Sequence, residues 1–155
     1  MTSTLTRSLL ASLLLATGIA FPVAPASAAA SCTSFTSSDA WPDGIPGLYH
    51  HVPSAGPETR NFNCVLGVGN NSLAVLALQE SLFVCYKQNI RRDRDFGGAT
   101  KTAVENAQKT INRVHPEARL AVDGVYGPRT SLYLQFQQYD HNNGGAHTGR
   151  CSRRF

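Results

Sequence analysis

The sequence predicts a mainly α-helical protein, a compact three-helix bundle with an irregular N-terminal arm and a C-terminal tail that disulfides tether. Three observations lead to this prediction. An eight-residue motif occurs twice, thirty residues apart, at 93–100 and 123–130; such self-similarity indicates one supersecondary unit used twice. Apolar residues recur at helical spacing beside both copies. Four cysteines lie outside the predicted helical stretches or near their ends.

The first 28 residues predict a secretory signal peptide. Arg7 gives a positive start, an apolar run follows at 9–21, and residues 26–28 form a small-residue cleavage site. The apolar run is too short to span a membrane comfortably. Cleavage after Ala30 and lipidation of Cys32 are alternatives. The predicted organisation is a signal peptide at 1–28, an arm at 29–63, a helical domain at 64–140 and a tail at 141–155.

The four cysteines, all in the predicted exported part, indicate two disulfides, because an even count outside the cytoplasm usually forms bridges. They are Cys32, Cys64, Cys85 and Cys151. Sequence alone leaves all three pairings open. Cys32 and Cys151 lie near the chain ends, so we expect at least one bridge to tie a terminal segment to the helical core. Their spacings do not resemble zinc ligand pairs, and no metal is expected.

The arm should be irregular, because the chain between Ser31 and Asn71 is rich in Pro, Gly, Ser and Asn and lacks a sustained period. Residues 41–47 have the composition of a turn. Short strands at 48–52 and 65–68 would pair as a small ribbon.

The first helix should start at Asn71 or Ser72, since either residue can cap it. Its expected inward stripe is Val75, Leu78, Leu82 and Cys85. Leu76 and Phe83 fall to one side of this stripe, so we expect the helix to be buried on more than one face.

The second helix should begin within 97–100 and stop at Pro116. Its apolar seam is predicted to contain Ala103, Val104, Ala107, Ile111 and Val114. The third helix should begin at Pro128, which suits the first helical position. We expect it to continue to Tyr139, with Tyr133, Leu134, Phe136 and Tyr139 facing inward. Gln79, Gln108 and Gln138 should occupy similar positions on the three helices.

Most of the repeated motif has an architectural interpretation. A short Asp accepts hydrogen bonds from nearby backbone N–H groups, and Gly permits the left-handed backbone of a tight turn. The residues interpreted as structural are Asp93, Phe96, Gly97 and Thr100 in the first copy and Asp123, Gly124, Gly127, Pro128 and Thr130 in the second.

This pattern resembles the peptidoglycan-binding domain of bacterial cell-wall hydrolases. The resemblance covers about residues 64–138 and rests on the motif Ala-Val-x-x-Leu-Gln-x-x-Leu at 74–82, followed by two copies of Asp-x-x-aromatic-Gly-x-x-Thr. It implies a three-helix module that attaches non-covalently to wall glycan or stem peptides. The chain departs from the family at Arg94, where Gly is usual, at Leu132 in place of an aromatic residue, and at Gln137 in place of Phe.

The resemblance implies peptidoglycan or an associated anionic wall polymer as the partner. Arginine grips carboxylates and phosphates through paired hydrogen bonds. The candidate contacts are Arg91, Arg92 and Arg94 on the first turn, with Tyr126 and Arg129 on the second. Gln79, Gln108 and Gln138 are candidates to line a groove. The alternative interpretation makes the arginines a solvated loop and Tyr126 part of the core.

No catalytic constellation stands out, so we expect a secreted monomer that is not an enzyme and needs no cofactor. Asp140 with His141 and His147 is the weak exception, and Asp93 with Asp95 is the closest carboxylate pair. A secreted interaction or inhibitor protein is the first alternative function, and a small cell-wall hydrolase is the second. Nucleic-acid binding is disfavoured because the formal net charge is only +4 and the chain is predicted to be exported.

Overall fold

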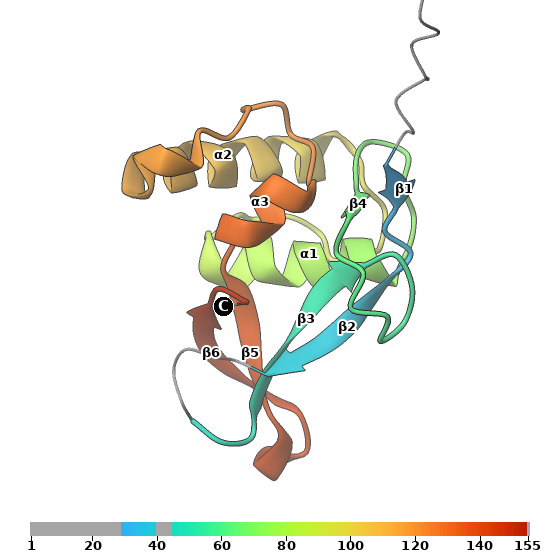
Figure 1. Ribbon diagram of the computed structural model, residues 1–155, viewed down its shortest axis with the longest axis vertical. Helices are drawn as coiled ribbons and strands as arrows, with labels where there is room; N and C mark the ends of the chain where they lie inside the picture. Colours follow the sequence, from blue (N-terminus) through green and yellow to red (C-terminus); the bar gives the residue numbers. More distant parts are fainter. Residues whose placement is uncertain (1–28, 40–44, 155) are drawn as a thin grey trace, which may run out of the picture.

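The computed structural model describes residues 29–39 and 45–154, and within them helices pack on a sheet (Figure 1). Three α-helices accompany a four-stranded antiparallel sheet and a two-stranded parallel one. The prediction of a mainly α-helical bundle is therefore wrong: the described fold is mixed α/β. The predicted signal peptide at 1–28 lies outside the described residues.

The arm, the end of the predicted helical domain and the tail together form the four-stranded sheet (Figure 1). Its strands, in spatial order, are β2 (Ser34–Asp39), β3 (Leu48–Ser54), β5 (Phe136–Asp140) and β6 (Ala146–Ser152). Tyr49 pairs with Tyr139, so a strand of the arm lies directly beside the strand that leads into the tail. The expectation of an irregular arm and tail is wrong because β3 of the arm pairs with the distant β5, and β6 of the tail forms a hairpin with β5.

The third helix is much shorter than expected. Helix α3 (Pro128–Tyr133) starts at the predicted proline but ends after six residues, since Leu134 is already extended, with φ −66° and ψ 138°. The predicted continuation to Tyr139 is wrong: this segment is β5, held between β3 and β6. Gln138 therefore lies on a strand and is not equivalent to Gln79 and Gln108.

The first two helices match their prediction closely. Helix α1 (Leu73–Cys85) is capped by Ser72, whose hydroxyl accepts a hydrogen bond of 3.3 Å from the Val75 N–H. Helix α2 (Gly98–Val114) ends before Pro116, where a short 3₁₀ turn, η1 (Pro116–Ala118), follows. In Figure 1, α1 lies between α2 and the sheet, and it contacts both. This position explains why α1 is buried on more than one face.

The remaining elements are short. Strand β1 (Ala30–Ser31) pairs in parallel with β4 (Cys64–Val65), and a second 3₁₀ turn, η2 (His141–Asn143), joins β5 to β6. The predicted ribbon between 48–52 and 65–68 is wrong, because β3 pairs with β2 and β5 instead.

Two disulfides fasten these elements. Cys32 bonds to Cys64 beside the parallel pair, and Cys85 at the end of α1 bonds to Cys151 of β6. The second bridge confirms the expected link between a terminal segment and the helical part. Disulfides form and persist in oxidising compartments, which agrees with an extracellular setting.

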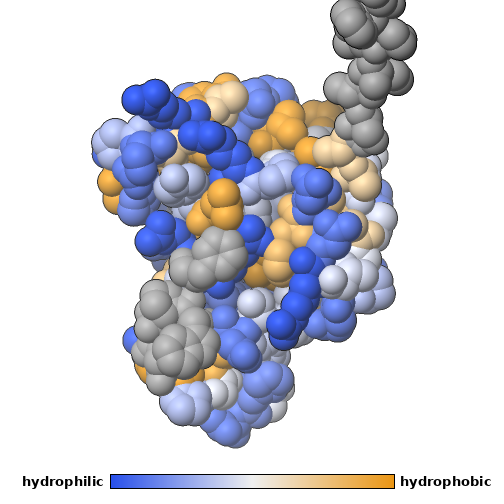
Figure 2. Space-filling model, in the orientation of Figure 1, coloured by the Kyte–Doolittle hydropathy of each residue, from blue (hydrophilic) through white to orange (hydrophobic). Residues whose placement is uncertain are grey.

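The main core brings α1, α2 and the two motif copies together. Its fully buried members include Leu78, Leu82, Val104, Phe96 and Tyr126. On the face drawn in Figure 2, hydrophilic residues cover most of the described surface, and apolar residues form smaller patches between them. No helix in the described ranges is both long enough and apolar enough to cross a membrane.

Candidate functional site

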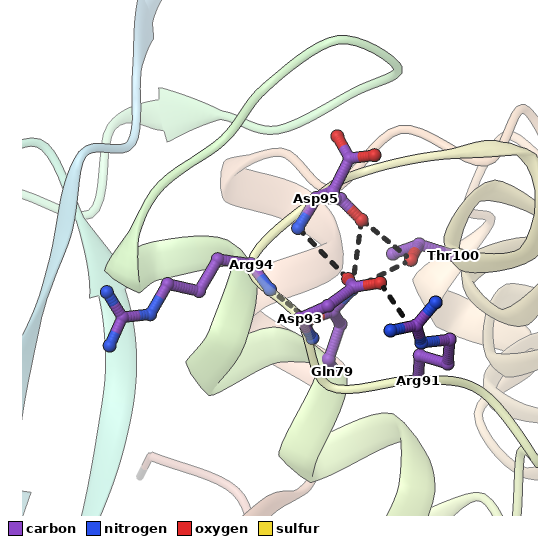
Figure 3. Close-up of polar contacts among 6 residues, drawn as sticks. All are labelled: Gln79, Arg91, Asp93, Arg94, Asp95 and Thr100. Atoms are coloured by element: carbon purple, nitrogen blue, oxygen red, sulfur yellow. Dashed lines mark hydrogen bonds and ion pairs between the residues drawn. The ribbon is translucent and has the colours of Figure 1, made fainter.

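The first motif copy forms a closed corner around the amide of Gln79 (Figure 3). This side chain is 1% exposed. Its Nε2 donates to Asp93 Oδ1 and the Asp95 carbonyl oxygen, both at 3.0 Å, and to Thr100 Oγ1 at 3.1 Å. Its Oε1 accepts from the N–H groups of Asp93 and Arg94, each at 3.0 Å. The single buried amide of Gln79 thus provides both hydrogen-bond donors and acceptors for the groups of the turn.

The second copy repeats this arrangement around Gln108. Its Nε2 donates to Asp123 Oδ1 and the Val125 carbonyl oxygen at 3.0 Å and to Thr130 Oγ1 at 3.4 Å. Its Oε1 accepts from the Gly124 N–H at 3.0 Å. The two corners therefore share one hydrogen-bonding plan, each anchored by a glutamine of the preceding helix, and α2 connects them.

The equivalent turn position holds Arg94 in one corner and Gly124 in the other. Both are left-handed, with φ 70° and 72°. A Cβ at Gly124 would lie 2.5 Å from Lys101 Cγ and 3.0 Å from the Lys101 carbonyl oxygen, so glycine is required there. Arg94 adopts the same conformation with a side chain, which costs about 1–2 kcal/mol for an L-residue.

The predicted arginines of the first corner lie at an exposed surface. Arg91 Nε lies 3.8 Å from Asp93 Oδ2, and the Arg92 guanidinium carbon lies 4.5 Å from the centre of the Phe83 ring. Arg94 extends away from the Gln79 network (Figure 3). We call Phe83, Arg91, Arg92 and Arg94 the arginine surface. Hydrogen bonds from Gln79 and the Asp95 N–H, with Arg91 nearby, lower the pKa of Asp93 and keep it ionised.

The second corner does not add its two predicted contacts to this surface. The Tyr126 side chain is fully buried, and burial raises the pKa of its hydroxyl. Its ring belongs to the core, as the alternative interpretation held. Arg129 is engaged locally, since its Nε donates to the Ala118 carbonyl oxygen at 2.7 Å. Tyr126 and Arg129 therefore lie outside the arginine surface, on which Arg91, Arg92 and Arg94 are all exposed and Arg94 extends away from Arg91 (Figure 3).

A cavity of about 230 Å³ lies between α1 and the sheet, at a place that sequence reasoning missed. We call it the ring cavity. Its lining residues are Phe35, His51, Leu73, Leu76, Ala77, Glu80, Tyr139 and His147. The sequence shows only separate rings, among them His51 and Tyr139, and the pairing of β3 with β5 is needed to bring them together.

Asp140, His141 and His147 do not meet in one cluster. His141 stacks on Tyr49 with ring centres 4.1 Å apart, whereas His147 Nδ1 hydrogen-bonds Gln137. Asp140 accepts from the Asn142 N–H at 2.8 Å. Each member of the weak Asp140, His141 and His147 constellation therefore has its own partner. Among the described residues, no group of three or more potential metal ligands is arranged to hold an ion.

Comparison with known proteins assigns no function to the arginine surface or to the ring cavity. No family model, no curated protein and no solved structure matches the chain.

Proposed function

We propose that this chain is an exported protein that binds bacterial cell-wall peptidoglycan, or an anionic polymer attached to it, without catalysing a reaction. The observation that carries the proposal is the pair of matching corners. Gln79 and Gln108 make the same bonds to the Asp, the third residue and the Thr of each motif copy. The residues on which the resemblance rests therefore act together as a repeated structural unit, and this supports wall binding as the function of that unit.

The arginine surface is the proposed contact. Arg91, Arg92 and Arg94 are exposed, and Arg92 lies over a partly exposed aromatic ring, Phe83. Guanidinium groups bind carboxylates and phosphates, both of which bacterial wall polymers carry. The strained backbone at Arg94 adds to this reasoning, because the equivalent corner uses glycine, and conformational strain is often retained at functional positions.

Co-sedimentation with purified sacculi at about 0.15 M salt tests the proposal. The wild-type protein should pellet with the sacculi, and Arg91→Ala/Arg92→Ala/Arg94→Ala should weaken retention about tenfold or more. Lys109→Ala/Arg113→Ala/Arg119→Ala is the matched control: it removes the same charge from other exposed positions and should retain wild-type binding.

Three results would contradict the proposal or its contact surface. Wild-type protein that stays in the supernatant would exclude wall binding and favour a secreted interaction partner. Reducing ends or free amines released from sacculi would instead indicate hydrolysis. Equal losses in the two triple variants would show that binding follows net charge and not the arginine surface.

A further inference from the structure

The ring cavity has one wall of stacked rings. Phe35 and His51 stack with ring centres 4.0 Å apart, His51 and Tyr139 lie 4.4 Å apart, and Tyr139 and His147 lie 5.0 Å apart. Strand register explains this row: Tyr139 pairs with His147, while His51 and Phe35 lie on the same sheet face in β3 and β2. The sheet thus presents a continuous, largely apolar wall.

The opposite wall is one face of α1. Leu73, Leu76, Ala77 and Glu80 have the spacing i, i+3, i+4 and i+7, and all four line the cavity. Glu80 supplies the only carboxylate among the lining residues. The space therefore resembles a slot with aliphatic and aromatic sides and a single acidic group toward one end.

Glu80 is held in a defined position. The Tyr139 hydroxyl donates to Glu80 Oε2, and burial together with this carboxylate raises the pKa of the phenol, which keeps it a donor. Among the described residues, no side chain donates to the other carboxylate oxygen of Glu80. Burial also lowers the pKa of His51 against the opposing influence of Glu80 and Glu58, so His51 is neutral around pH 7. The neighbouring ring therefore does not neutralise the carboxylate.

A cationic group lies beyond the Glu80 end of the cavity, outside its lining residues. Phe83 lies one helical turn beyond Glu80, and Arg92 sits over the Phe83 ring. The charge of Arg92 is close enough to affect the Tyr139 hydroxyl. Glu80 therefore lies inside the cavity, and the Arg92 guanidinium lies outside its lining, about one helical turn further along α1.

We propose that the ring cavity binds a primary ammonium group on an aliphatic stem, with Glu80 as its counter-ion and Arg92 binding a carboxylate at the far end. This inference rests on the proposed function: an uncrosslinked diamino acid at the free C-terminus of a peptidoglycan stem peptide has this chemistry. The apolar walls accept the stem.

Small probes test each end of the site separately. Binding of ε-aminocaproate, caproate and pentylamine is measured by NMR titration of the intact protein. ε-Aminocaproate should bind most tightly, and signals of Leu76, Ala77 and His51 should shift. Failure of ε-aminocaproate to bind at millimolar concentration, or equal binding of caproate, overturns the inference.

Two charge variants locate the contacts. Glu80→Gln retains an oxygen that can accept from Tyr139, so folding should persist, whereas affinity for ε-aminocaproate should fall about tenfold to a hundredfold. Glu117→Gln, an equal charge change at an exposed position, should leave affinity unchanged. Arg92→Gln should remove the advantage of ε-aminocaproate over pentylamine. Unchanged binding in Glu80→Gln overturns the site.

Sacculi with acetylated amines separate this inference from the proposed function. If both hold, acetylation weakens retention and ε-aminocaproate competes with native sacculi. Retention that acetylation leaves unchanged, with no ε-aminocaproate binding, rejects the cavity ligand and keeps wall binding. Glu80-dependent binding of ε-aminocaproate by a protein that native sacculi do not retain rejects wall binding and identifies a free amino acid or peptide as the source of the ligand.

Discussion

Two buried glutamine side chains define the corners of this protein more sharply than any apolar residue. Each amide has both a donor and an acceptor, and the corner uses both: Gln108 Nε2 reaches Asp123 and Val125, while its Oε1 accepts from Gly124. An apolar side chain of similar size could fill the space and would leave these groups unpaired. Buried polar groups without partners cost more than the net value of the bonds they lose.

Gln108→Leu should therefore lower the free energy of unfolding by about 3 kcal/mol, as measured by urea denaturation. Gln135→Leu, at an exposed position, should change it by less than about 0.5 kcal/mol. A similar small effect in both variants would mean that the corner reorganises around leucine at little cost.

The left-handed turn position offers a paired test in which the two corners should respond in opposite directions. Arg94→Gly should raise the free energy of unfolding by about 1 kcal/mol, because it relieves the strained backbone at φ 70°. Gly124→Ala should lower it by about 2 kcal/mol, since the new Cβ meets Lys101. The same Arg94→Gly variant should bind sacculi less well. A stabilised variant with full retention would remove Arg94 from the proposed surface.

At the scale of elements, neighbouring residues of α1 contact the first corner, the ring cavity and the arginine surface. Gln79 closes the first corner, Glu80 faces the ring cavity, and Phe83 lies under Arg92. A helix buried on several faces can hold these groups in fixed relation, which a surface helix could not. The proposed amine and carboxylate contacts therefore depend on the same rigid element.

Helices and strands differed in how well the sequence predicted them, for a physical reason. Both long helices have apolar spacing, and α1 also has a polar cap at Ser72, so local signals suffice. Several buried strand positions hold polar residues, namely Thr36, His50 and Gln138. The sequence therefore lacks the alternation of apolar and polar residues that would have predicted these strands. Residues 134–139 fit a helix or a strand, and only pairing with distant strands decides between them.

The same limit applies to the candidate site. The arginine surface is local, since Arg91, Arg92 and Arg94 belong to one turn, and it could be predicted from sequence. The ring cavity draws residues from β2, β3, α1, β5 and β6. No local pattern predicts that assembly, because it depends on a sheet register between segments far apart in the chain.

Strand β3 should make stability depend on pH through His51. Burial lowers the pKa of His51 below its ordinary 6.5, against the fields of Glu80 and Glu58 and with His147 and His50 adding to the shift. The unfolded state therefore binds the proton first, and the free energy of unfolding should fall as the pH drops below 6.5 toward the folded-state pKa. Denaturation between about pH 7 and about pH 5 should show a smaller fall for His51→Gln than for wild type. Parallel pH profiles would contradict this assignment.

At the scale of the whole molecule, the sheet joins the beginning and the end of the described chain around α1. Strand β3 pairs with β5, although the entire helical part lies between them in the sequence, and β6 is bonded to the end of α1 by the Cys85–Cys151 disulfide. Such long-range pairings form only after a large loss of chain entropy. Covalent links between distant segments are therefore well placed to stabilise this topology.

The Cys85–Cys151 bridge closes a loop of 66 residues and ties α1 directly to β6. In the chain-entropy model, Cys85→Ala/Cys151→Ala should cost about 4 kcal/mol, with Cys32→Ala/Cys64→Ala costing slightly less because its loop is 32 residues. Urea denaturation of each double variant measures these losses. Loss of the Cys85–Cys151 bridge should also weaken ε-aminocaproate binding, since β6 supplies His147 to the ring cavity, whereas loss of the Cys32–Cys64 bridge should not. Equal effects of the two variants on ligand binding would mean that β6 is held in place without its covalent link.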